Sequence, residues 1–258
     1  MKAMLYHEYG SPDVLQYEET EKPVPGDDQV LIKVRAASVN PYDWHFLRGL
    51  PYPLRIAAGL RKPKNTRLGV DVGGQVESVG RNITQFKPGD EVFGVARGAF
   101  AEYAFAAESK LALKPENVTF EQAASAPIAG LTALQGLRRG GLGDGAQIPS
   151  TRKVLINGAG GGVGTFAVQI AKSFGAEVTG VCSAGKVEMV GSLGADHVMD
   201  YTKEDFTKSG QRYDLILDSV ANHSLSTIKG VLNPRGSYIM VGVADGGGRW
   251  MTGVMSRS

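Results

Sequence analysis

Eight residues, Asn157 to Gly164, have the types and spacing that could bind a pyrophosphate. The sequence of this turn is N-G-A-G-G-G-V-G, and residues 162–167 read G-V-G-T-F-A, a G-x-G-x-x-A variant of the dinucleotide-binding fingerprint. Glycines let the backbone turn sharply and approach a phosphate closely, and the free N–H groups at the start of a helix attract its charge. A tight turn without a ligand is the alternative.

The elements on both sides of this turn must position it. Lys153–Asn157 is predicted to be a short apolar strand, and Thr165–Phe174 has the apolar spacing of an amphipathic helix. Glu177–Cys182 supplies a second strand, which completes a strand-helix-strand unit of the expected ~30 residues. The sequence therefore predicts a Rossmann-type dinucleotide site.

The residues after the second strand indicate which dinucleotide would bind. An NAD site normally presents Asp or Glu there, about 20 residues past the glycines, to bind the ribose hydroxyls. Here Ser183 can donate a hydrogen bond and Lys186 can neutralise a 2′-phosphate, so we expect NADPH. The alternative for Lys186 is an ordinary exposed lysine in the next helix.

The rest of the chain divides into two patterns. Residues 1–127 contain short strand-like runs between Gly, Pro and Asp clusters, which predicts a β-rich domain. Residues 128–258 alternate apolar strands with helical stretches, which is typical of a parallel sheet. Ligands of such sheets lie beyond the carboxyl ends of the strands. We therefore expect three residues at the ends of two further strands to border the cofactor: Ser219, Val241 and Gly242.

Composition limits the function classes. The chain has 258 residues, 42% of them hydrophobic and 21% charged, as in a soluble globular protein. A net charge of +2 is too small for the positive field that nucleic-acid binding needs. No signal peptide or apolar run of ~20 residues is present, so we expect a cytoplasmic protein without stable membrane insertion.

Metal ligands are scarce. The single cysteine, Cys182, excludes an intrachain disulfide and a thiolate cluster. None of the four histidines forms a ligand-like pair, and a site built from His45 and Asp71 would lack the third ligand of a catalytic zinc. We therefore expect no metal.

Five segments carry a resemblance to a known family: Ala37–Trp44, Gly69–Gly74, Lys87–Val92, Ala129–Ala133 and Ala159–Gly164, the last together with Gln169 and Lys172. With them the whole chain resembles the medium-chain dehydrogenase/reductase superfamily, specifically its zinc-free quinone oxidoreductase branch. The zinc enzymes would carry a cysteine near Asn40 and Gly-His-Glu at residues 69–71, so both ligand positions are replaced.

The resemblance implies a GroES-like first domain followed by a Rossmann-type, doubly wound parallel sheet. It places Asn40, Trp44 and Thr132 near the nicotinamide. It places the glycine turn under the pyrophosphate, with Gly161, Gly162, Val163 and Gly164. It places three residues around the adenosine phosphate: Ser183, Lys186 and Tyr201. Relatives continue well past the strand that ends at Gly242, so we expect a truncated second domain with an open sheet edge.

The implied activity is hydride transfer from NADPH to a quinone or to the C=C bond of an α,β-unsaturated carbonyl compound, bound between the domains without a metal. The candidate catalytic residues are Asn40, His45 and Tyr52. His45 and Tyr52 could donate to the developing enolate oxygen or could equally be packing residues, and family members usually carry tyrosine at position 45. A zinc-dependent alcohol dehydrogenase and a non-catalytic NADPH-binding protein or inactive fragment are the alternatives. A homodimer stays open.

Overall fold

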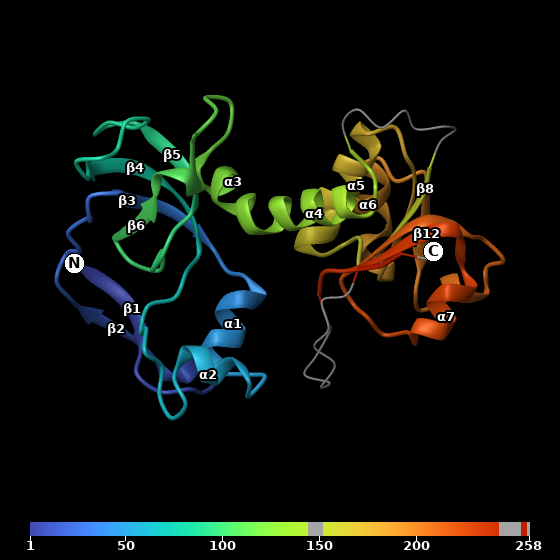
Figure 1. Cartoon of the computed structure of the whole chain (residues 1–258), viewed down its shortest axis with the longest axis horizontal. Coiled ribbons are helices and arrows are strands. Elements are labelled where there is room, and N and C mark those ends of the chain that lie inside the picture. The colour runs from blue at the N-terminus through green and yellow to red at the C-terminus, as the bar shows by residue number, and fades with distance from the viewer. Residues whose placement is uncertain (144–151, 243–253, 257–258) are drawn as a thin grey trace. The chain divides into compact units, whose positions relative to one another are not determined.

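The computed structural model describes residues 1–143, 152–242 and 254–256. It divides into two compact units, Met1–Ile128 and Ala129–Ser258, which we call the N-terminal unit and the C-terminal unit (Figure 1). The predicted fold class is confirmed, because a β-rich unit precedes a unit with a parallel sheet.

An antiparallel sheet of five strands forms the N-terminal unit, in the order β6-β3-β4-β5-β7. Its core contains Val30, Ile32, Val72 and Val92, which are fully buried. A separate antiparallel pair, β1 and β2, completes the unit. The bounds of these strands are β1 (Lys2–Tyr6), β2 (Leu15–Glu19), β3 (Gln29–Ser38), β4 (Asp71–Val79), β5 (Glu91–Val95), β6 (Tyr103–Ala107) and β7 (Leu111–Leu113).

The helices of this unit follow local start and stop signals. Helix α1 (Pro41–Arg48) begins with proline at its first position and ends at Gly49, whose φ of 59° is left-handed. Helix α3 (Phe120–Ser125) begins at a capping box, in which Thr119 and Gln122 each accept the backbone N–H of the other. The remaining helices are α2 (Leu54–Ala58), η1 (Pro12–Val14) and η2 (Glu108–Lys110).

The C-terminal unit contains five parallel strands in the order β10-β9-β8-β11-β12, the doubly wound arrangement. A sixth strand, β13, pairs antiparallel with β12 at Ser237–Ile239. An open sheet edge was expected beyond Gly242; β13 covers β12 at these three residues and is itself the outermost of the described strands. The bounds are β8 (Lys153–Asn157), β9 (Glu177–Cys182), β10 (His197–Asp200), β11 (Tyr213–Asp218), β12 (Leu232–Met240) and β13 (Val254–Ser256).

Both faces of this sheet are buried. Val154 and Ile156 of β8 pack into one core cluster with residues of α4 and α5, while Leu155 packs into a second cluster with Ile228 of α7. Successive side chains of a strand point to opposite faces, so the continuous apolar run of β8 matches a sheet covered on both sides. The helices are α4 (Pro127–Arg139), α5 (Gly162–Ser173), α6 (Val187–Ser192), α7 (Leu225–Gly230), η3 (Ala184–Lys186) and η4 (Phe206–Lys208).

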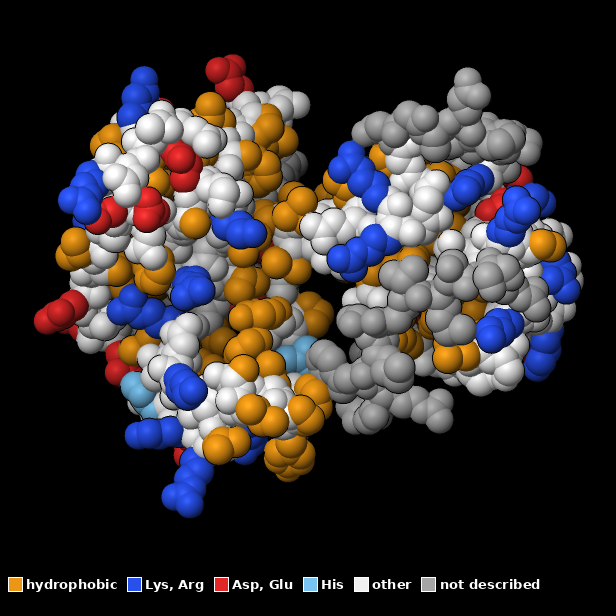
Figure 2. All heavy atoms as spheres, viewed as in Figure 1, with side chains coloured by type: hydrophobic (Ala, Val, Ile, Leu, Met, Phe, Trp, Pro, Cys, Tyr) orange, Lys and Arg blue, Asp and Glu red, His pale blue; other side chains and the backbone are white. Residues whose placement is uncertain are grey.

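The surface carries mixed charge. On the face shown in Figure 2, basic side chains are scattered among apolar and polar ones. Among the helices that the structure describes, none has the length and apolar character needed to cross a bilayer.

Candidate functional site

The glycine turn lies between β8 and α5, as predicted. Gly158 has a left-handed φ of 88°, and the N–H groups of Gly158 and Ala159 both donate to the carbonyl of Val181 in β9, at 3.1 and 2.9 Å. Gly161 caps the helix, which begins at Gly162 rather than at the predicted Thr165. The first N–H groups of a helix have no partner within it, so the start of α5 presents donors at the carboxyl end of β8.

Two glycines of this turn have different neighbours. A Cβ on Gly164 would lie 2.2 Å from the carbonyl oxygen of Gly158 and 2.6 Å from the Cα of Ala159. Among the described residues, a Cβ on Gly162 would meet only the Cβ of Ala129, at 3.9 Å. Gly164 is therefore needed for close packing of the helix onto the turn, whereas Gly162 leaves open space over the helix start.

The three residues expected around an adenosine phosphate lie at the carboxyl ends of adjacent strands. Ser183 follows β9, Lys186 ends η3, and Tyr201 follows β10. The N–H of Tyr201 donates to the carbonyl of Cys182, at 3.1 Å, which joins the two strand ends. The Lys186 ammonium donates to the carbonyl of Gly160, at 2.8 Å, so this lysine reaches the glycine turn.

The residues expected at the ends of β11 and β12 also lie together. The N–H of Val241 donates to the carbonyl of Asp218, at 2.9 Å, and a Cβ on Gly242 would lie 3.0 Å from the carbonyl oxygen of Ser219. The Oγ atom of Ser219 is buried and makes no hydrogen bond within the described part of the chain.

Sequence reasoning missed Asp218, which organises this end of the sheet. Its carboxylate is fully buried and accepts hydrogen bonds from the Nδ2 of Asn157 (2.9 Å), the N–H of Val220 (2.9 Å), the N–H of Ala221 (2.8 Å) and the hydroxyl of Tyr238 (3.0 Å). Burial, and then the negative charge of Asp218, raise the pKa of Tyr238. The available signal was an acidic residue that ends an otherwise apolar strand.

In the N-terminal unit, a second buried carboxylate holds Asn40. One oxygen of Asp71 accepts from the Oγ of Ser38, at 2.9 Å, and from the Nδ2 of Asn40, at 3.0 Å. Its other oxygen accepts the N–H of Ile128 in the first turn of α4, at 3.1 Å. Burial raises the pKa of Asp71, although these donors oppose the rise.

A third buried carboxylate, Asp43, was also missed. It accepts the backbone N–H of Asn40 and that of Gly69, both at 2.9 Å, and burial raises its pKa. Asn40 is thus fixed by Asp71 through its side chain and by Asp43 through its backbone. An acidic residue three positions after the N-cap Asn40 is the capping-box pattern that could have found Asp43.

Of the other two predicted catalytic residues, His45 lies on helix α1 and Tyr52 does not. The rings of Trp44 and His45 lie edge to face, 4.7 Å apart, on the same helix as Asn40's partner Asp43. The Nδ1 of His45 is 3.0 Å from the carbonyl oxygen of Leu50. Tyr52 lies outside this helix and is 70% exposed, so the structure does not bring it into the Asn40 network.

Thr132 belongs to the C-terminal unit, on helix α4. The preceding turn of this helix lies against the start of α5: the Cβ that Gly162 lacks would face Ala129, and the one that Gly130 lacks would face the ring of Phe166. Thr132 is thus on the helix that packs beside the glycine turn.

A zinc site does not fit the donor set. Within residues 1–143, 152–242 and 254–256, no three His, Cys, Asp or Glu side chains are grouped so that they could hold a metal ion. In the described part of the chain, His45 and Asp71, the candidates weighed from the sequence, gain no third ligand.

Comparison with known proteins places the chain in a family. The model of the alcohol dehydrogenase GroES-like domain matches residues 26–116, and that of the zinc-binding dehydrogenase domain matches residues 162–253. The 2-methylene-furan-3-one reductase of Solanum lycopersicum is 40% identical over 233 residues, which are 85% of this chain and 57% of the relative. The chain thus spans little more than half the length of that relative.

Two further relatives are covered more fully. The chloroplastic quinone-oxidoreductase homolog of Spinacia oleracea is 35% identical over 93% of this chain and 74% of its own length. The crystal structure of Escherichia coli quinone oxidoreductase complexed with NADPH is 27% identical, with a TM-score of 0.78 over 95% of this chain and 76% of that chain. The chain therefore belongs to the medium-chain dehydrogenase/reductase superfamily, in its quinone oxidoreductase branch.

Proposed function

We propose that this protein is an NADPH-dependent oxidoreductase that transfers hydride, without a metal, to a quinone or to the C=C bond of an α,β-unsaturated carbonyl compound. The carrying observation is that β9 ends without Asp or Glu and is followed by Ser183 and by Lys186, whose ammonium donates to the carbonyl of Gly160 in the glycine turn, while Tyr201 follows the neighbouring strand β10. The named substrate and cofactor of the tomato and Escherichia coli relatives support the same class of reaction.

The residues of the C-terminal unit fit this cofactor. The helix start at Gly161–Gly164 would hold the pyrophosphate. Lys186, together with Ser183 and Tyr201, would bind the 2′-phosphate. The hydroxyl of Ser219, which has no partner among the described residues, would bind a further polar group of the dinucleotide. NADPH, when bound, supplies the hydride.

The residues of the N-terminal unit would orient the acceptor. Asp71 and Asp43 fix Asn40 from two sides, which preorganises its position. Since the carbonyl of Leu50 can only accept, the Nδ1 of His45 must carry the proton in their hydrogen bond.

The cofactor assignment is tested by binding NADPH and NADH to the wild type and to Lys186→Ala. Loss of a charge-assisted hydrogen bond worth about 1.5–3 kcal/mol should weaken NADPH binding about 10- to 150-fold relative to NADH. The ratio is the informative quantity, because Lys186 also donates to Gly160 and its loss affects both dinucleotides. Lys208→Ala, an exposed lysine of the same unit, is the matched control. Equal affinity of the wild type for both dinucleotides would contradict the assignment.

The activity is tested by NADPH oxidation with a panel of enones and quinones, together with metal analysis. Turnover by a metal-free preparation is the expected result. Stoichiometric zinc would instead favour an alcohol dehydrogenase, and NADPH binding without turnover of any acceptor would favour a non-catalytic binding protein. The same proposal includes three further points. The domain assignment 1–127 and 128–258 is tested by expression of the separate domains. A cytoplasmic location is tested by cell fractionation, and a homodimer is tested by sedimentation.

A further inference from the structure

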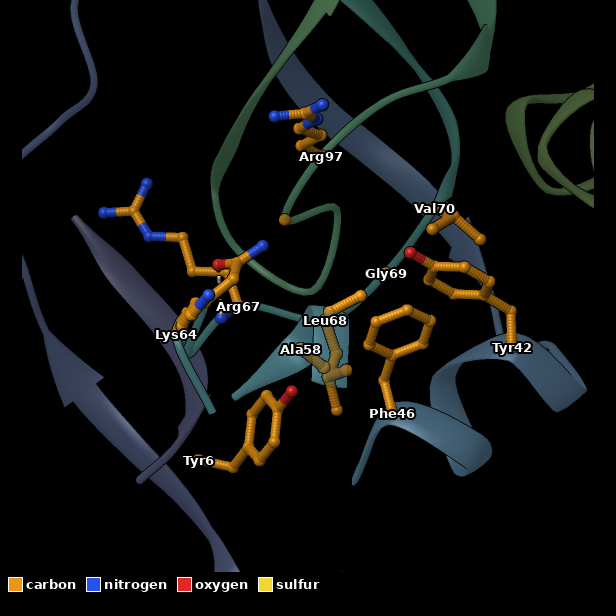
Figure 3. Close-up of a pocket in the computed structure, with 13 residues that line it drawn as sticks. Tyr6, Tyr42, Phe46, Ala58, Lys64, Arg67, Leu68, Gly69, Val70 and Arg97 are labelled. Atoms are coloured by element: carbon orange, nitrogen blue, oxygen red, sulfur yellow. Dashed lines mark hydrogen bonds between the residues drawn. The ribbon is translucent and has the colours of Figure 1, made fainter. Parts of the chain in front are cut away.

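A cavity of about 250 Å³ lies within the N-terminal unit, apart from every residue assigned above to NADPH. Aromatic and aliphatic side chains form its apolar part, chiefly Tyr6, Tyr42, Phe46 and Leu68 (Figure 3). The rings of Tyr42 and Phe46 lie 4.3 Å apart at an interplanar angle of 31°, so they stack on one another in the wall of the cavity. Tyr6 and Leu68 are buried beneath it.

Three cationic side chains line the same cavity: Lys64, Arg67 and Arg97. They come from two loops that are distant in the sequence, one before β4 and one after β5. Lys64 and Arg67 belong to a basic run at residues 55–67, which also contains Arg55, Arg61 and Lys62. Gathering like charges costs electrostatic free energy, which a bound anion would offset.

Among the residues that the structure describes, no carboxylate lines the cavity to neutralise these cations. The carboxylate behind it, Asp43, is buried and already accepts two backbone N–H groups, including that of Gly69 in the cavity wall. Burial raises the pKa of Tyr6 to about 12, and burial together with Asp43 raises that of Tyr42. Both phenols therefore remain neutral hydrogen-bond donors near neutral pH.

We propose that this cavity binds a small monocarboxylate with an aromatic or aliphatic body. The body packs against Tyr42 and Phe46, and the carboxylate faces Lys64, Arg67 and Arg97. Guanidinium groups match the planar geometry of a carboxylate. The volume of the cavity is slightly below the ~300–1,000 Å³ of drug-sized ligand sites, so it suits a molecule of the size of benzoate.

The test is titration of the full chain with benzoate, benzamide and inorganic phosphate, followed by NMR of the Gly69 and Gly98 amides. These glycines line the cavity, and the N–H of Gly98 donates to the carbonyl of Gly69, at 3.1 Å. Benzoate should shift both amides saturably, and benzamide, which has the same shape without the charge, should bind at least tenfold more weakly. Phosphate should also bind more weakly, because it leaves the aromatic surface uncovered.

Two substitutions separate the cavity from general surface charge. Arg97→Gln should weaken benzoate about tenfold, whereas Arg61→Gln, in the same basic run but outside the cavity lining, should leave it unchanged. Both side chains are exposed, so both variants should retain the wild-type melting temperature. Equal binding of benzoate and benzamide, equal effects of the two substitutions, tighter binding of phosphate, or no saturable shift would each overturn the proposal.

Discussion

Gly164→Ala should destabilise the C-terminal unit although alanine is the better helix former. The added Cβ would lie 2.2 Å from the Gly158 carbonyl oxygen and 2.6 Å from the Ala159 Cα, so it meets backbone rather than a flexible side chain. Overpacking of this kind costs about 3 kcal/mol at the upper end of its usual range, against about 1 kcal/mol gained from helix propensity. We expect a net loss of about 2 kcal/mol and weaker NADPH binding, because the start of α5 must move away from the turn.

The matched control is Gly162→Ala, in the same helical turn, where the new Cβ meets nothing closer than the Cβ of Ala129, at 3.9 Å. It should be neutral or stabilising by up to about 1 kcal/mol. Native-state hydrogen exchange of the Leu155 and Ile156 amides measures the opening of this unit separately from the rest of the chain. Equal exchange rates in the two variants would refute the steric argument.

Three further predictions follow from the buried and capping carboxylates. Tyr238→Phe removes a donor 3.0 Å from Asp218 and should cost about 1.5–3 kcal/mol by urea unfolding; an unchanged midpoint would contradict the hydrogen bond. Asp71→Asn turns an acceptor of three donors partly into a donor, so thermal unfolding should reveal a loss of about 1–3 kcal/mol, and wild-type stability would count against the network. Hydrogen bonds from Thr207 lower the pKa of Asp205, so its carboxylate stabilises the fold above pH 3.8 and loses this effect as the pH falls through the lowered value. The destabilisation caused by Asp205→Asn should therefore shrink below pH 3.8, and a pH-independent difference in melting temperature would refute this.

Elements with a clear periodicity could be predicted from the sequence. Strands β8 and β9 begin and end at the predicted residues. Helix α5 begins three residues earlier than predicted, because glycines at a helix start carry no hydrophobic pattern. Strand β12 begins at Leu232 although the following Asn-Pro-Arg is typical of a turn, and Arg235 has a positive φ of 65°.

The candidate site was predictable only where its residues lie at strand ends or in one motif. Ser183, Lys186 and Ser219 could be predicted as candidates because the carboxyl ends of parallel strands meet at one edge. The bond from Asn40 to Asp71 joins residues 31 positions apart, and no spacing rule links them. The same holds for Lys64 and Arg97, which meet at one cavity only after the sheet has formed.

The carboxylate of Asp71 also has an evolutionary consequence. It connects the end of β3 through Ser38, the start of α1 through Asn40 and the start of α4 through Ile128. A neutral residue at position 71 leaves hydroxyl, amide and backbone donors without an acceptor, and only the first two can be removed by substitution. Lineages that lose this acid should therefore change positions 38 and 40 along with it, and should find another acceptor for the backbone of residue 128.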